Sequence, residues 1–116
     1  MPIWWQKKEK PNNELTEIKG DKYAIGGYQS EKRRKYTNHS LTLNEGDAVY
    51  ICTDGYSDQF GGLNSKKFMS RQLKELLLRI HKESMPEQKQ ILNNAFEAWK
   101  GKEEQVDDIL VIGVRV

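Results

Sequence analysis

Two apolar runs, one in the middle of the chain and one at its end, constrain the fold more than any other feature. Residues 48–53 read AVYICT and residues 109–116 read ILVIGVRV, so apolar side chains would lie on both faces of each strand. A strand that is apolar on both faces is typical of the interior of a sheet, where both faces are covered. The last run is therefore predicted to be a central strand.

Three more strands are expected before the first of these runs. Residues 3–5 (IWW) are apolar and residues 14–19 (ELTEIK) alternate, with a turn-like EKPNN segment between them. This pattern predicts a hairpin over residues 2–19. Residues 36–43 (YTNHSLTL) also alternate and are followed by turn residues, which predicts a third strand.

After residue 67 the spacing of apolar residues changes to that of two amphipathic helices. The second helix is predicted to begin at Ser84, because Ser84 and Glu87 match a capping box and Pro86 suits a first turn, and to end at Gly101. The first helix is expected from apolar residues at helical spacing: Leu73, Leu76, Leu77 and Ile80. The predicted order is β-β-β-β-α-α-β, an α+β fold.

Length and composition limit the domain count and the kinds of partner. A chain of 116 residues fits one domain, residues 1–116, and 19 Lys and Arg against 17 Asp and Glu give a net charge of only +2. This balance does not favour a nucleic-acid partner. The one cysteine, Cys52, lies in an apolar run and is expected to be a buried, reduced thiol, which suits the cytoplasm. No apolar run reaches the ~20 residues that span a bilayer.

Acidic residues stand where two predicted strands meet loops. Asp54 directly follows one apolar run, and Asp107 and Asp108 directly precede the other. Carboxylates fixed at strand ends suit Mg²⁺ or Mn²⁺, and Gly55 would let the backbone turn past an ion. The alternative is structural, because Asp-Gly is also a strong hairpin signal and an Asp pair before a strand is often a solvated turn. Asp58 is expected to cap or solvate the loop, and the alternative is that it reaches the same cleft as an outer-shell group.

The residues after Gly55 do not supply the strand that a hairpin needs. A hairpin at Asp54-Gly55 should return as an alternating strand, whereas residues 56–67 (YSDQFGGLNSKK) are polar and carry two more glycines. This observation favours the metal interpretation.

Three segments together resemble the SpoIIE-like branch of the PPM family of metal-dependent protein serine/threonine phosphatases. They are residues 14–27 (ELTEIKGDKYAIGG), 46–62 (GDAVYICTDGYSDQFGG) and 105–116 (QVDDILVIGVRV), with two helices before the last. The resemblance is to the C-terminal half of that domain. It implies a β-sandwich with flanking helices and a site for two Mn²⁺ or Mg²⁺ ions that activate water against a phosphoserine or phosphothreonine.

The resemblance also implies roles for particular residues. Asp54 is similar to the metal ligand of the family's Thr-Asp-Gly motif and Asp107 to the metal-binding acid of its terminal motif, with Asp108 secondary. The earlier acidic motif of the family, beside a Gly-His-Gly element, has no counterpart in this chain. The isolated chain is therefore expected to be inactive. The implied substrate is a phosphorylated regulator such as an anti-sigma-factor antagonist, in a cytoplasmic protein or the cytoplasmic part of a membrane-attached sensor.

The remaining candidate residues have ordinary interpretations. His39 and His81 lack metal-ligand neighbours, and the basic run 31–35 (EKRRK) is typical of a solvated loop. Trp4 and Trp5 would be core residues or, in a half domain, a surface through which the fragment self-associates. The alternative function is a non-catalytic module that binds a protein partner through its sheet and basic loop.

Overall fold

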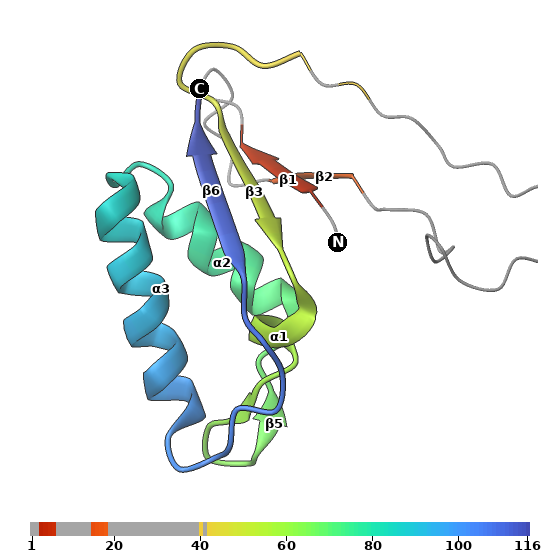
Figure 1. The fold of residues 1–116 in the computed structure, drawn as a ribbon, viewed down its shortest axis with the longest axis vertical. Helices are drawn as coiled ribbons and strands as arrows, with labels where there is room; N and C mark the ends of the chain where they lie inside the picture. Colours follow the sequence, from red (N-terminus) through yellow and green to blue (C-terminus); the bar gives the residue numbers. More distant parts are fainter. Residues whose placement is uncertain (1–2, 7–14, 19–39, 41) are drawn as a thin grey trace, which may run out of the picture.

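The computed structural model describes residues 3–6, 15–18, 40 and 42–116. In this part of the chain a four-stranded antiparallel sheet is accompanied by two long helices (Figure 1). A short helical turn and a small two-stranded hairpin follow the third strand. The elements are β1 (Ile3–Gln6), β2 (Thr16–Ile18), β3 (Ala48–Cys52), α1 (Asp54–Ser57), β4 (Phe60–Gly61), β5 (Lys66–Lys67), α2 (Ser70–Ile80), α3 (Met85–Lys100) and β6 (Val111–Arg115).

The strand order of the main sheet is β2-β1-β3-β6. The N-terminal hairpin is confirmed, since Ile3 pairs with Ile18 and Trp5 with Thr16. The prediction of a central last strand is wrong among the described residues, where β6 pairs only with β3 and ends the sheet. The apolar sequence of β6 does not mean that both of its faces are buried, because Ile112 and Val114 remain 44% and 51% exposed.

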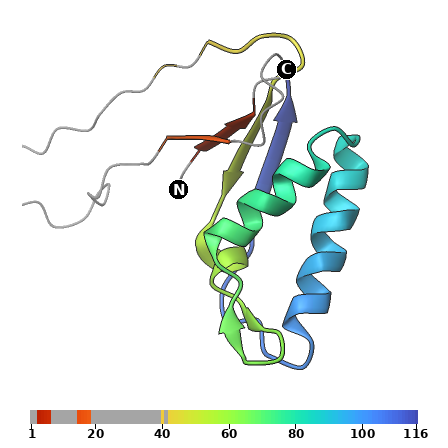
Figure 2. The same cartoon turned by 180° about the vertical axis from the view of Figure 1, so that it is seen from behind.

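Both long helices lie on one face of the sheet, as the two opposite views show (Figures 1 and 2). Side chains of β1 and β3 on this face pack against the apolar side of α2. The buried residues of α2 are the four that the sequence predicts from their helical spacing. Burial of these side chains supplies the main driving force for folding. The buried residues of this core cluster are Trp4, Ala48, Tyr50, Cys52, Tyr56, Phe68, Leu73, Leu76, Leu77, Ile80 and Phe96.

The second helix begins and ends as predicted. The backbone N–H of Glu87 donates to Ser84 Oγ at 3.3 Å, Pro86 lies in the first turn, and Gly101 is the C-cap with a positive φ of 53°. Arg115 then fastens the last strand to the turn between the helices, because its guanidinium donates to the carbonyl oxygens of His81 and Glu83.

Two predictions about the first part of the chain need correction or fall outside the described residues. Trp4 and Trp5 do not form an exposed surface, since they are only 2% and 8% exposed, and Trp5 Nε1 donates to the buried Asp47 carboxylate at 3.1 Å. The strand expected over residues 36–43 lies mostly outside the described part of the chain. Within it, Ser40 and residues 42–44 are not in a strand.

Candidate functional site

The two acidic segments lie at the same end of the sheet because β3 and β6 are antiparallel. Cys52, the last residue of β3, pairs with Val111, the first residue of β6. The chain that leaves β3 at Asp54 therefore starts beside the chain that arrives at β6 from Asp107 and Asp108 (Figure 1). The register of the sheet brings together two motifs that are far apart in the sequence.

Thr53 extends the strand pairing across this end of the sheet. Its backbone N–H donates to the carbonyl oxygen of Leu110 at 2.9 Å, and its side-chain Oγ1 accepts from the backbone N–H of Leu110 at 3.0 Å. The same Oγ1 lies 3.4 Å from the carbonyl oxygen of Asp108. The Thr53 hydroxyl thus holds the segment that follows Asp108 against the segment that precedes Asp54.

Gly55 allows the two segments to touch. A Cβ atom placed on Gly55 would lie 2.1 Å from the carbonyl oxygen of Asp108, a distance that no side chain tolerates. The sequence interpretation, a sharp turn past an ion, gives the wrong reason, because residues 54–57 form the helical turn α1 and Gly55 is not among the positive-φ glycines. The same turn excludes a hairpin at Asp54-Gly55. What requires the glycine is the close approach of the backbone of Asp108.

The three predicted acidic residues are exposed on these adjoining segments. Asp54 is the first residue of α1, and the side chain of Asp107 accepts the backbone N–H of Asp108 at 2.8 Å. Exposed carboxylate oxygens are the ligands that Mg²⁺ and Mn²⁺ prefer. Within the described residues no group of three or more His, Cys, Asp or Glu side chains converges on one point. The metal-ligand roles of Asp54, Asp107 and Asp108 therefore stay predictions.

The two glycines of the FGG motif allow the end of α3 to pack closely against this loop. Cβ atoms on Gly61 and Gly62 would lie 2.0 Å from the carbonyl oxygen of Trp99 and 2.9 Å from its ring. The backbone N–H of Gly62 donates to that carbonyl oxygen at 3.0 Å, and Trp99 Nε1 donates to the carbonyl oxygen of Gln59 at 2.9 Å. The sequence places Trp99 on the apolar face of this helix, and Trp99 packs against the core. Gln59 was not predicted from the sequence, although the two adjacent glycines indicate a close backbone contact.

Comparison with known proteins agrees with this arrangement of motifs. The family model of stage II sporulation protein E (SpoIIE) matches residues 1–116. The chain belongs to the SpoIIE family. The comparison with curated protein sequences found no match.

Comparison with solved structures supports the family assignment at the level of the fold. The SiaA-PP2C domain of Pseudomonas aeruginosa is 29% identical, with a TM-score of 0.82. The match covers 99% of the SpoIIE chain and 42% of the solved chain. The SpoIIE chain thus has the α+β fold of part of a PP2C-type phosphatase domain, and it spans less than half the length of the chain that it matches.

The other candidate residues take ordinary places in the SpoIIE chain. Asp58 is the C-cap of α1, and its carboxylate lies 3.8 Å from Lys67 Nζ, so Asp58 caps the turn and forms an ion pair within the loop region, as predicted. Burial raises the pKa of the Cys52 thiol to about 12, which makes Cys52 an unreactive core residue. Burial also lowers the pKa of His81, with smaller contributions from Lys82 and Arg115. His39 and the basic run 31–35 lie outside the described residues.

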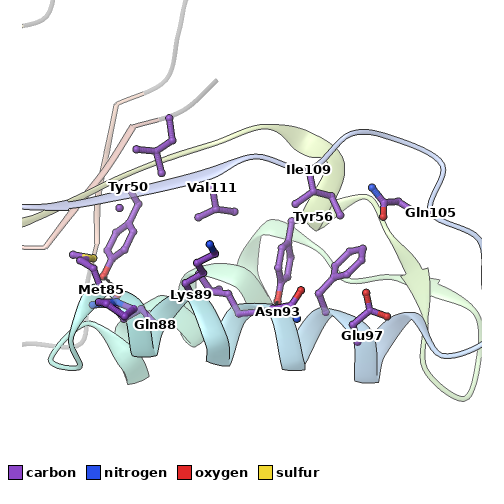
Figure 3. Close-up of a pocket in the computed structure, with 15 residues that line it drawn as sticks. Tyr50, Tyr56, Met85, Gln88, Lys89, Asn93, Glu97, Gln105, Ile109 and Val111 are labelled. Atoms are coloured by element: carbon purple, nitrogen blue, oxygen red, sulfur yellow. Dashed lines mark hydrogen bonds between the residues drawn. The ribbon is translucent and has the colours of Figure 1, made fainter.

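A groove of about 860 Å³ runs between α3 and the edge of the sheet (Figure 3). Tyr50 and Val111 point into it from the strands, and Met85, Lys89 and Asn93 line it from α3. Its floor is fixed by two hydrogen bonds. The Tyr50 hydroxyl donates to Gln88 Oε1 at 2.7 Å, and the Tyr56 hydroxyl donates to the carbonyl oxygen of Leu92 at 2.8 Å.

The opposite face of the sheet is apolar and open. Ile112, Val114 and Val116 are 44%, 51% and 47% exposed, although a strand this apolar is ordinarily covered. An apolar surface of this kind usually marks an interaction site. A shallow hollow on this face is lined by Leu43, Val49, Ile51, Ile112, Val114 and Val116.

The described part of the chain contains no helix that is long and apolar enough to cross a membrane.

Proposed function

We propose that this chain is the metal-binding C-terminal part of a protein serine/threonine phosphatase that depends on Mn²⁺ or Mg²⁺. The observation that carries the proposal is the contact between Gly55 and the backbone of Asp108, which joins the Thr-Asp-Gly motif to the terminal Asp-Asp motif. Membership of the SpoIIE family and likeness to a PP2C domain support the same reaction class. A non-catalytic binding module is not favoured by these matches.

Asp54 and Asp107 are the residues that would hold the cation, with Asp108 in a secondary role. Both are exposed carboxylates beside a rigid strand end, so the strand pairing and the Thr53 hydroxyl limit their movement. The bound ions supply an activated water and stabilise the charge that develops on the phosphoryl oxygens. The contribution of this chain is to orient the carboxylates.

The whole domain is proposed to complete the site. Two fixed carboxylates bind Mg²⁺ or Mn²⁺ weakly, because tight binding requires several oxygen ligands held in near-octahedral geometry. The open apolar face and the groove beside β6 are the surfaces that the rest of the domain would cover. The proposed substrate is a small phosphorylated regulator such as an anti-sigma-factor antagonist, met in the cytoplasm by a protein with an upstream sensor region.

Activity measurements test this proposal. At millimolar Mn²⁺ the 116-residue chain should not hydrolyse a phosphoserine peptide above background, whereas a chain extended through the whole domain should. Asp54→Ala or Asp107→Ala should abolish the activity of the extended chain, and Asp58→Ala should leave most of it because Asp58 faces Lys67. An extended chain that is active and indifferent to both of the first two substitutions would refute the proposal.

A further inference from the structure

Gln59 is a buried polar residue directly before the hairpin β4–β5, and its side chain forms a hydrogen bond with the segment that leads to Asp107. Its side chain is 1% exposed. The amide nitrogen Nε2 donates at 2.9 Å to the carbonyl oxygen of Phe60 and at 2.9 Å to that of Glu104. Glu104 lies three residues before Asp107 on the segment that leads to β6. One buried amide group thus joins the chain after Asp54 to the chain before Asp107.

The backbone of Gln59 is itself held firmly. Its carbonyl oxygen accepts from Trp99 Nε1 at 2.9 Å and from the backbone N–H of Phe68 at 2.9 Å. The Trp99 ring packs edge-on against Phe68 with ring centroids 5.4 Å apart, and Phe68 belongs to the core. Gln59 is therefore a fixed point of the core rather than part of a mobile loop.

The segment that Gln59 holds is otherwise fixed mainly at its far end, where Thr53 and Gly55 contact the backbone of Asp108. Residues 101–108 are all exposed, so burial of their own side chains does not order them. A second contact, from Ser65 Oγ to Glu103 Oε1 at 2.8 Å, is made at the surface. Hydrogen bonds from a buried donor are worth more than exposed ones, because the partner would otherwise be left unpaired away from water.

We propose that Gln59 is a positioning residue for the metal site: its side-chain amide sets the position of the 101–108 segment and thereby places Asp107 beside Asp54. This inference rests on the proposed function, because the position of Asp107 affects metal binding only if Asp54 and Asp107 bind a cation. The choice of glutamine follows from the donor count. An amide offers two N–H groups to two carbonyl oxygens, whereas a carboxylate of the same shape offers none.

The test compares Gln59→Glu with Gln90→Glu, the same change at an exposed residue whose Nε2 contacts Asn94. In ¹⁵N relaxation of the 116-residue chain, amides 103–108 should have order parameters of about 0.85 in the unchanged chain and below about 0.6 in Gln59→Glu. The Leu110 amide, which donates to Thr53 Oγ1, should exchange about tenfold faster, as expected for loss of a buried hydrogen-bonded group. Gln90→Glu should change neither.

A second variant and a second measurement keep the outcomes distinct. If Gln59→Glu fails to fold, Gln59→Met keeps the volume without the donors and should loosen the same amides while β3 stays protected. Addition of Mn²⁺ should broaden the signals of Asp54 and Asp107 together in the unchanged chain, and Asp107 less than Asp54 in the variant. Unchanged order of 103–108 in a folded Gln59 variant would overturn the inference. Absence of broadening in the unchanged chain would instead refute the proposed metal site.

Discussion

Because Gly55 has no side chain, the two acidic segments can approach each other closely. The carbonyl oxygen of Asp108 occupies the place where a Cβ atom would be, at 2.1 Å. Any other residue would push the Asp108 segment away from α1 or strain both segments. The cation site proposed at Asp54 and Asp107 depends on this backbone contact.

Substitution of this glycine is the first prediction. Gly55→Ala should lower the free energy of unfolding by about 3 kcal/mol, as for overpacking against an immobile neighbour, in urea denaturation followed by circular dichroism. Gly101→Ala is the matched control, since nothing lies within 4 Å of its Cβ position and its φ of 53° alone should cost about 1 kcal/mol. Equal losses for the two variants would show that the contact with Asp108 is not constrained.

Single residues are predictable from the sequence where local chemistry decides the outcome, and the burial of Cys52, which follows from its apolar neighbours, is confirmed. The metal-binding roles of Asp54 and Asp107, inferred from carboxylates at strand ends, stay predictions. Gln59 is not predictable in this way, because a glutamine in a polar stretch carries no pattern that indicates burial. Its partners at Trp99 and Glu104 are more than 39 residues away in sequence, and only the fold brings them close.

At the scale of secondary-structure elements, the cap of α3 offers a clean measurement. Ser84 accepts the backbone N–H of Glu87 at 3.3 Å, whereas Ser70 is the first residue of α2 and the N-cap of that helix is Met69, without a side-chain bond. Ser84→Ala should therefore destabilise the chain by about 1 kcal/mol in urea denaturation. Ser70→Ala should be neutral to within about 0.5 kcal/mol, the usual range for surface changes. A reversed order of the two effects would contradict the cap assignment.

The helices and strands were predictable to different degrees for a physical reason. The apolar spacing of α2 and the capping residues of α3 act locally, so both helices lie where the sequence places them. The place of β6 in the sheet depends instead on which neighbours it pairs with, and an apolar run does not contain that information. The turn α1 and the hairpin β4–β5 are too short for any periodicity to appear.

At the scale of the whole molecule, the open sheet face predicts self-association. Val49, Ile51, Ile112 and Val114 form an apolar surface opposite the helices, in place of the Trp4-Trp5 surface expected from the sequence. Light scattering at high protein concentration should report species larger than a monomer. The double substitution Ile112→Lys and Val114→Lys should restore the monomer, because charges on this face oppose burial.

Val106→Lys provides the control for that experiment. Val106 is 71% exposed but lies in the loop before β6 rather than on the sheet face. The substitution Val106→Lys should therefore leave the self-association unchanged. A strictly monomeric unchanged chain, or equal effects of the loop and sheet substitutions, would show that the open face does not drive association.

The central claim is that the Thr-Asp-Gly and Asp-Asp motifs form one cation site, and Mn²⁺ titration of the ¹⁵N-labelled 116-residue chain tests it most directly. Paramagnetic broadening should appear at the amides of residues 53–55 and 106–108 at the same Mn²⁺ concentration, in the range of weak binding. Asp54→Asn should abolish it at both segments, and Asp58→Asn should not. Broadening that appears at only one segment, or that persists at 106–108 in Asp54→Asn, would contradict the claim.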